Sequence, residues 1–168
     1  ELQLMDEPNR EGRLKLALQP VRDNYDFIII DCPPSLSLLT LNALAAADGI
    51  IVPMQCEYFA LEGLSSLIKT INALKQKLNP ALEIDGIIRT MYDVRNNLAN
   101  AVSNELTTHF GDTVYRTLVP RNVRLAEAPS HGMSIIRYDK SSRGALAYMG
   151  LSGQVIQRMN KKSVKEKV

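Results

Sequence analysis

The sequence is poor in the residues that form disulfide frameworks and zinc sites. It has 2 cysteines, Cys32 and Cys56, and 2 histidines among 168 residues. A disulfide-stapled domain or a zinc module needs several such residues at short spacing. Both classes are therefore excluded, and we expect the two cysteines to be small, partly buried residues at strand ends in a protein of a reducing compartment.

Long apolar runs and aromatic platforms are missing as well. The longest apolar runs, such as residues 27–30, have strand length and fall far short of the ~18 residues of a membrane span. The 6 methionines and 6 tyrosines are scattered, without the aromatic platform of a single-strand nucleic-acid binder. The remaining composition, 45% hydrophobic and 23% charged, is that of a soluble globular chain long enough for one domain.

Charge is distributed unevenly along the chain. Residues 1–111 carry 9 Lys or Arg and 14 Asp or Glu, a balance of −5, whereas residues 112–168 carry 11 and 4, a balance of +7. The net charge of +2 hides this asymmetry. A basic C-terminal third favours a polyanionic partner, nucleic acid or an anionic membrane surface, although such segments also occur merely as solubilising tails.

Apolar runs and amphipathic stretches alternate along the chain. Runs of strand length predict buried strands at 25–31, 49–54, 84–90 and 114–119, and an edge strand at 134–138. Apolar spacings of three and four predict helices at 36–47, 60–78, 97–110, 122–128 and 142–159. Strands joined by helical crossovers indicate an α/β fold, with a doubly wound, mostly parallel sheet and helices on both faces.

Local signals mark the ends of some helices. Ser35 is the expected N-cap of the helix at 36–47. The last helix should carry Leu146, Met149, Ile156 and Met159 on one face, and the tail after Met159 should fray. We therefore assign residues 1–160 to one domain and residues 161–168 to a basic tail.

Ligands of open α/β sheets bind beyond the carboxyl ends of the strands, which points to Asp31 and to residues 54–57, 90–93 and 120–122. Asp31 follows four apolar residues, as the Mg²⁺-holding Walker B aspartate does, although an acid there could also cap the next helix. None of the 9 glycines forms the phosphate-binding loop that normally accompanies such an aspartate. Either the domain does not bind nucleotides, or the loop belongs to sequence that is not included.

Three segments carry a resemblance to a known family. They are YDFIIIDCPPSLSLLTLNAL at 25–44, MQCEYFALEG at 54–63 and VPRNVRLAEAPSHG at 119–132. The chain resembles the ParA/Soj chromosome- and plasmid-partitioning ATPases of the ParA/MinD group, from about residue 10 to residue 159. The likeness is to the C-terminal two-thirds of such proteins, which implies a P-loop NTPase fold without its N-terminal P-loop segment and without activity by itself.

The resemblance implies ATP and Mg²⁺ as cofactors. Asp31 matches the catalytic aspartate that positions Mg²⁺ through water. The remaining nucleotide-binding positions are the second switch and the adenine-holding walls, namely Cys32, Pro33, Pro34, Thr90, Met91, Pro120, Arg121 and Asn122. The alternative for residues 120–122 is an ordinary strand-to-helix turn that Asn122 caps.

The resemblance also implies a homodimer, non-specific binding to double-stranded DNA, a ParB-type partner and a nucleoid-associated bacterial protein of the cytoplasm. The expected DNA contacts are basic residues of the last third, namely Arg116, Arg137, Lys140, Arg143, Lys161 and Lys162. These contacts would be directed at phosphates and blind to sequence.

Two other functions remain open. A MinD-like, membrane-associated division-site ATPase would need bulky apolar residues on a C-terminal amphipathic helix, and few occur after Leu151, so no stable membrane association is expected. A non-catalytic interaction module would use exposed apolar faces to self-associate. His109 and His131 have no partners at catalytic spacing and are expected to be structural.

Overall fold

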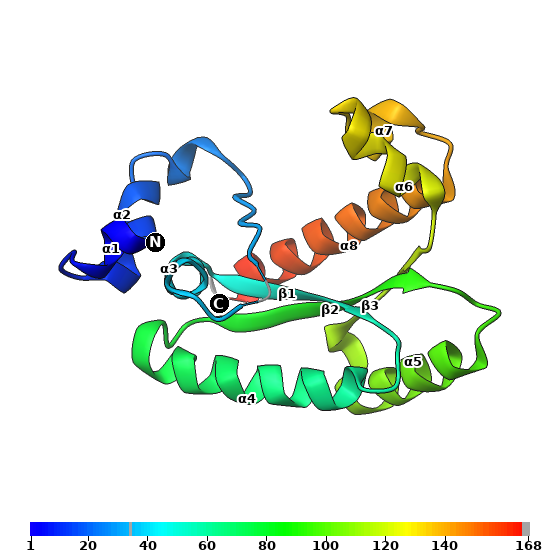
Figure 1. The fold of residues 1–168 in the computed structure, drawn as a ribbon, viewed down its shortest axis with the longest axis horizontal. Coiled ribbons are helices and arrows are strands. Elements are labelled where there is room, and N and C mark those ends of the chain that lie inside the picture. The colour runs from blue at the N-terminus through cyan, green and yellow to red at the C-terminus, as the bar shows by residue number, and fades with distance from the viewer. Residues whose placement is uncertain (34, 166–168) are drawn as a thin grey trace. The chain divides into compact units, whose positions relative to one another are not determined.

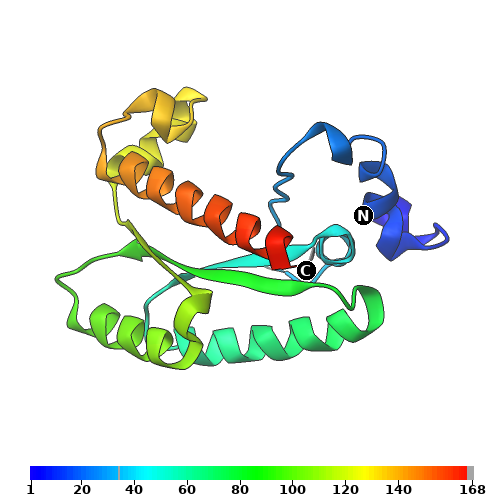
Figure 2. The same ribbon diagram turned by 180° about the vertical axis from the view of Figure 1, so that it is seen from behind.

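The computed structural model describes residues 1–33 and 35–165, and the chain divides into two compact units. The first unit comprises Glu1–Ile50 and Ser65–Asp85, and the second comprises Ile51–Leu64 and Gly86–Val168. Figures 1 and 2 show the course of the chain from two opposite sides.

The first unit begins with short helices that pack around buried asparagines. These helices are α1 (Leu2–Met5), η1 (Arg10–Gly12), α2 (Arg13–Leu18), η2 (Arg22–Asn24) and α3 (Leu38–Ala46). The Asn42 Oδ1 accepts a hydrogen bond of 3.0 Å from the Leu14 N–H, and its Nδ2 donates to the Arg10 carbonyl at 2.7 Å. The Asn79 Nδ2 donates to the Ala47 carbonyl at 2.7 Å, which closes the end of α3. Each buried amide thus satisfies backbone groups that the short helices leave unpaired.

The strand predicted at residues 25–31 is not formed. Residues 27–33 have no regular secondary structure, and Ile29 is 91% exposed. A strand persists only where its backbone N–H and C=O groups pair with a neighbouring strand, and an apolar run does not supply that neighbour. The N-cap prediction was also wrong, because α3 starts after Ser37 rather than Ser35.

The three remaining long strands form one sheet, in the order β1-β2-β3. They are β1 (Gly49–Gln55), β2 (Glu83–Tyr92) and β3 (Val114–Pro120). Helix α4 (Ala60–Leu78) connects β1 to β2, and α5 (Asn97–Phe110) with η3 (Gly111–Thr113) connects β2 to β3. β2 pairs with β3 in parallel. The predicted α/β fold is confirmed, including the bounds of both crossover helices.

Two apolar clusters cover the two faces of the sheet in the second unit. On one face, Cys56 and Tyr92 pack against Ala99 and Val102 of α5. On the other face, Ile88, Tyr115 and Val119 pack against Leu151 of α8 (Arg143–Lys165). Figures 1 and 2 show α5 and α8 on opposite sides of the strands. β2 and β3 are therefore covered on both faces, whereas Ile51 of β1 is 38% exposed.

The edge strand predicted at residues 134–138 is wrong, because this segment is a helical turn. Between β3 and α8 the chain forms α6 (Val123–Glu127), η4 (Ala128–His131) and α7 (Ile135–Tyr138). From α8, which covers one face of the sheet, the Gln154 Oε1 accepts a hydrogen bond of 3.0 Å from the Arg116 N–H of β3.

Helix α8 differs from its prediction in two ways. Its helical backbone continues to Lys165, whereas fraying was expected after Met159. Of the predicted apolar face, Met149 and Met159 are partly buried, whereas Leu146 and Ile156 are 56% and 46% exposed. Gly144, Ala145 and Leu151 are buried in this helix. None of the described helices is long and apolar enough to cross a bilayer.

Candidate functional site

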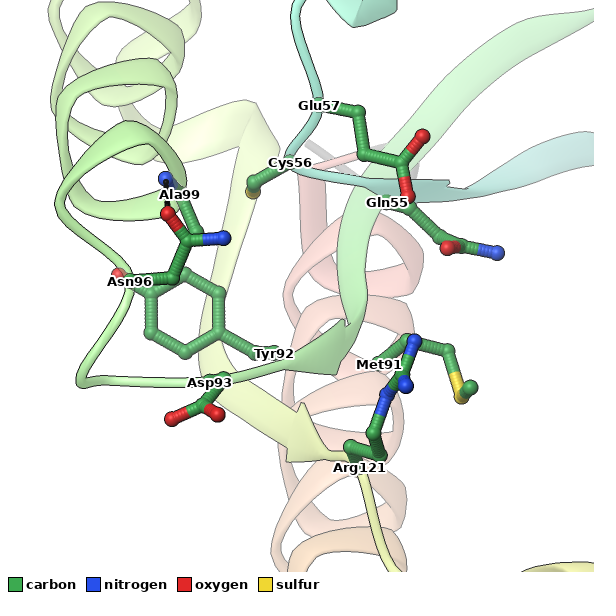
Figure 3. Close-up of a pocket in the computed structure, with 9 residues that line it drawn as sticks. All are labelled: Gln55, Cys56, Glu57, Met91, Tyr92, Asp93, Asn96, Ala99 and Arg121. Atoms are coloured by element: carbon green, nitrogen blue, oxygen red, sulfur yellow. Dashed lines mark hydrogen bonds between the residues drawn. The ribbon is translucent and has the colours of Figure 1, made fainter.

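A pocket of about 250 Å³ lies at the carboxyl ends of the strands in the second unit. Three of the four segments singled out by the topology argument contribute to it: residues 54–57, 90–93 and 120–122. Figure 3 shows side chains that line the pocket, which are Gln55, Cys56, Glu57, Met91, Tyr92, Asp93, Asn96, Ala99 and Arg121. A pocket of this size is below the usual range for a complete drug-sized ligand.

Met91 reaches the pocket from an unusual backbone conformation. Its φ is 51°, in the left-handed region, and the pairing of β2 with β3 shifts register between Arg89 and Tyr92. Such an irregularity at the end of a strand redirects a side chain that the regular pleat would send elsewhere. Met91 and Arg121 both line the pocket, and Figure 3 shows Asn96 on the opposite side of the view from both.

Tyr92 holds two loops of the pocket in place. Its carbonyl accepts a hydrogen bond of 3.2 Å from the Arg121 N–H, and its phenol donates to the Asn100 Oδ1 at 2.7 Å. The Asn100 Nδ2 in turn donates to the Val94 carbonyl at 2.9 Å. The loop after β2 and the loop after β3 are therefore both fixed to the end of one strand.

Asp93 and Arg95 form an exposed ion pair at the rim. The Asp93 carboxylate accepts from the Nη2 of Arg95 at 2.8 Å and from its Nε and backbone N–H at 3.0 Å. These hydrogen bonds hold the pKa of the Asp93 carboxyl well below its usual range. Arg121 adds a smaller favourable charge. The loop after β2 therefore carries a fixed charge pair at neutral pH.

A buried cation lies close to the Cys56 wall of the pocket. Arg89 is 8% exposed, and its guanidinium donates to the Ser103 Oγ at 2.8 Å and to the Tyr115 carbonyl at 2.7 Å. Burial lowers the pKa of Arg89, and burial raises the pKa of the Cys56 thiol although the Arg89 charge opposes that rise. Cys56 is buried just beyond β1, as expected, and burial keeps its thiol protonated and weakly reactive.

The other residues of the predicted base-binding set make contacts within the fold. The Thr90 Oγ1 donates to the Met54 carbonyl at 3.2 Å. Pro120 is the last residue of β3 and pairs with Tyr92. The Asn122 Oδ1 accepts from the Arg124 N–H at 2.9 Å and caps α6. The structure thus places only Met91 and Arg121 of this set in the pocket wall, and base binding by the set stays a prediction.

The predicted Mg²⁺ and switch residues lie in the first unit. Asp31, Cys32 and Pro33 are exposed in the irregular segment before α3, and Pro34 lies outside the described residues. Burial, with the Asp31 charge, raises the pKa of the Cys32 thiol. Because Cys32 is exposed and at no strand end, the expectation of a partly buried residue was wrong for it. No group of three His, Cys, Asp or Glu suited to a metal occurs among the described residues, so a Mg²⁺ ion here would depend on nucleotide and water ligands besides Asp31.

The predicted DNA contacts are exposed but do not form one cluster. Arg137, Lys140 and Arg143 lie around the junction of α7 and α8, whereas Lys161 lies ~27 Å further along α8 at 1.5 Å per residue. Arg116 is exposed on β3, and the side chain of Lys162 lies outside the described residues. The α7–α8 junction and the region of Lys161 are therefore separate surfaces, and DNA contact by these residues stays a prediction.

Both histidines make contacts inside the fold. The His109 Nδ1 lies 3.0 Å from the Glu105 carbonyl within α5. The His131 ring stacks on Tyr138 with centroids 4.9 Å apart. These contacts fit the structural roles expected from the sequence.

Three residues that line the pocket were not predicted individually from the sequence, namely Asn96, Glu57 and Asp93. Asn96 caps α5 through its Oδ1, which accepts from the Leu98 and Ala99 N–H groups, and it lines the pocket as well. Glu57 and Asp93 lie in segments that the topology argument flagged, yet the resemblance assigned neither a role. The sequence indicates where each strand ends. It does not indicate the register shift near the end of β2, which affects the side chains that line the pocket.

Comparison with known proteins gives a consistent picture. A family model described as an AAA domain matches residues 1–84, which is half of the chain. The chain is 52% identical over 168 residues to the chromosome partitioning protein ParA of Myxococcus xanthus, covering 100% of this chain and 59% of that protein. It is 54% identical over 155 residues to the sporulation initiation inhibitor protein Soj of Bacillus subtilis, covering 92% of this chain and 61% of that protein.

Among solved structures, the cobyrinic acid a,c-diamide synthase of Mycobacterium smegmatis with bound ADP and magnesium is similar, with a TM-score of 0.77 and 32% identity. The match covers 95% of this chain and 58% of that one. The chain thus spans about three-fifths of the length of the curated relatives it matches.

Proposed function

Because the chain belongs to the ParA/Soj family of chromosome-partitioning ATPases, we propose that it serves the ATP-dependent segregation of DNA. In this proposal two ATP-bound copies dimerise, and the dimer binds double-stranded DNA on the nucleoid without sequence preference. A ParB-type centromere-binding partner then stimulates hydrolysis. The observation that carries the proposal is the 52% identity with a partitioning protein over the whole chain.

The proposed reaction is the transfer of a phosphoryl group from ATP to water, in which bound Mg²⁺ neutralises developing charge. Asp31 is proposed to position that ion through water. The pocket that Met91 and Arg121 line is the proposed binding site of the adenine, because it offers an apolar side chain and polar groups in a volume of about 250 Å³.

We also propose that the 168 residues by themselves do not hydrolyse ATP. The sequence contains no phosphate-binding loop, and a single exposed carboxylate cannot hold a triphosphate. Hydrolysis is therefore to be tested in a fusion protein, in which the part of M. xanthus ParA that this chain does not match precedes residue 1.

The DNA-binding part of the proposal is supported by exposed basic side chains at the α7–α8 junction. Arg137, Lys140 and Arg143 are exposed, and none of them forms an ion pair with the described residues. Unpaired cations of this kind suit phosphate contacts that release counterions.

The test is a DNA titration by fluorescence anisotropy with that fusion and ATP. The double variant Arg137→Glu/Arg143→Glu should weaken binding at least tenfold and lower the salt slope by about 2. Lys77→Glu, an exposed position of α4 outside the basic third, is the control and should change little. Equal effects of the two changes would count against the proposal.

A further inference from the structure

A carboxylate at the end of α6 holds two helical turns together. The Glu127 Oε2 accepts hydrogen bonds from the Arg124 Nη1 at 2.9 Å and from the Tyr138 phenol at 3.2 Å. Arg124 lies on α6 with Glu127, whereas Tyr138 is the last residue of α7. One oxygen atom therefore joins α6 to a residue of α7 that lies 11 positions further along the chain.

Asp139 extends this connection to the start of α8. Its Oδ2 lies 3.6 Å from the Arg124 Nε, and its carbonyl accepts a hydrogen bond of 2.8 Å from the Ser142 Oγ. The Ser142 Oγ in turn accepts from the Ala145 N–H at 3.1 Å, in the first turn of α8. We call the side chains of Arg124, Glu127, Tyr138 and Asp139 the clasp.

Packing and charge hold the clasp in place. Figures 1 and 2 show α6 and α7 beside the beginning of α8. Leu125 of α6 packs against the apolar cluster that contains Leu151, and a Cβ at Gly144 would lie 2.5 Å from the Leu125 Cγ, so α6 meets α8 closely at a glycine. The Arg124 hydrogen bond lowers the pKa of the Glu127 carboxyl, which keeps the clasp charged at neutral pH.

One end of the clasp adjoins the candidate pocket. Arg121 lines the pocket, and its backbone N–H donates to the Tyr92 carbonyl at 3.2 Å. Asn122 follows, and its Oδ1 accepts from the Arg124 N–H at 2.9 Å. The chain thus passes from a wall of the pocket to the clasp within residues 121–124, through a capped helix start.

The other end of the clasp lies among the exposed cations of the α7–α8 junction. Arg137 directly precedes Tyr138, Lys140 directly follows Asp139, and Arg143 is the first residue of α8. Long cationic side chains lose conformational freedom when they bind phosphates, and a backbone that is fixed beforehand lowers this cost. The clasp fixes the backbone from which these three side chains project.

We propose that Glu127 is a positioning residue that couples a nucleotide in the pocket to the affinity of the α7–α8 junction for DNA phosphates. This inference rests on the proposed function, because it requires ATP beside Arg121 and DNA at the junction. A nucleotide that contacts Arg121 shifts the start of α6, and Glu127 transmits the shift to α7. The coupling lies in the different affinities of the two clasp arrangements for DNA.

The test measures the binding of labelled double-stranded DNA to the fusion protein by fluorescence anisotropy, with and without ATP. We expect ATP to tighten binding at least tenfold in the parent fusion, and Glu127→Ala to reduce this ratio at least fivefold. The ATP affinity, measured without DNA, should stay within twofold. Glu127→Gln should retain most of the ratio, because its amide oxygen still accepts from both donors. Glu105→Ala, at an exposed carboxylate of α5, is the matched control and should leave the ratio unchanged.

Hydrogen exchange in the 168-residue chain tests the positioning role without ATP or DNA. The Asp139 N–H donates to the Ile135 carbonyl at 2.8 Å, and its exchange should be at least tenfold faster in Glu127→Ala. Unchanged exchange, or an undiminished effect of ATP in the Glu127→Ala fusion, would overturn the proposal. A parent fusion whose DNA affinity does not respond to ATP would contradict the proposed function, and the exchange rates alone would then decide whether Glu127 positions α7.

Discussion

The phenol of Tyr92 donates a 2.7 Å hydrogen bond to the Asn100 Oδ1, so a strand end and a helix are fastened beside the candidate pocket. The carbonyl of the same tyrosine accepts from the Arg121 N–H. Tyr92 is 9% exposed, and its ring belongs to the apolar cluster on the α5 face. One residue thus connects the core of the second unit with both loops that border the pocket.

Removal of the Tyr92 hydroxyl should cost stability. Tyr92→Phe leaves the half-buried Asn100 oxygen without this donor, and we expect the free energy of unfolding to fall by about 1 kcal/mol. Urea denaturation at pH 7 measures the change. Tyr58→Phe is the control, because Tyr58 is 74% exposed, and a loss as large as that of Tyr92→Phe would refute the structural role of the hydrogen bond.

The left-handed backbone at Met91 predicts an unusual order of stabilities. Asparagine tolerates this conformation, whereas a β-branched residue does not. Met91→Asn should therefore be neutral or slightly stabilising, and Met91→Val should destabilise by about 1–2 kcal/mol. The thermal unfolding of both variants decides the matter. A Met91→Val protein as stable as the Met91→Asn protein would mean that the backbone at this site is not left-handed.

The ion pair of Asp93 and Arg95 predicts an acid dependence with a definite sign. Because the folded state lowers the pKa of Asp93, its stabilising contribution is present above the ordinary carboxyl pKa of 3.8 and is lost as the pH falls below it. Asp93→Asn should therefore destabilise the chain at pH 7 and much less at pH 2.

Urea midpoints at the two pH values, at low salt, provide this measurement. Asp112→Asn replaces an exposed carboxylate that forms no ion pair with the described residues, and it should show no such pH-dependent difference. A penalty for Asp93→Asn that is equal at both pH values would contradict the assignment.

The exposed apolar segment before α3 predicts self-association. Phe27 is 44% exposed and Ile29 is 91% exposed, and Leu39 of α3 is 48% exposed. Large apolar side chains exposed to water promote association. Light scattering should show a mass that grows with concentration, and Ile29→Lys should reduce it. Val123→Lys, at an exposed position of α6, should not, and a strictly monomeric chain would exclude the prediction.

Periodicity was a reliable guide where an element could be defined by its own side chains. The bounds of α4 and α5 agree with the ranges 60–78 and 97–110 that the apolar spacing predicted, because an amphipathic helix satisfies its own backbone. The strand predictions were confirmed for β1, β2 and β3 but were wrong for residues 25–31 and 134–138. Residues 25–31 have the composition of a buried strand, yet strand pairing depends on a partner that composition cannot reveal.

The candidate site was predictable in outline only. The rule that ligands bind beyond strand ends located three of the four segments correctly. The rule did not reveal that Met91 would line the pocket from a positive φ, at the register shift between β2 and β3. The cap that the Asn122 oxygen makes on α6 is the alternative that the sequence offered for residues 120–122.

ATP hydrolysis by the fusion with the uncovered part of M. xanthus ParA tests the central claim most directly. A steady-state phosphate-release assay should show Mg²⁺-dependent hydrolysis by the fusion, none by the 168-residue chain, and a loss of at least 100-fold in Asp31→Ala. An Asp31→Ala fusion that is folded and hydrolyses ATP as fast as the parent fusion would contradict the assignment of Asp31.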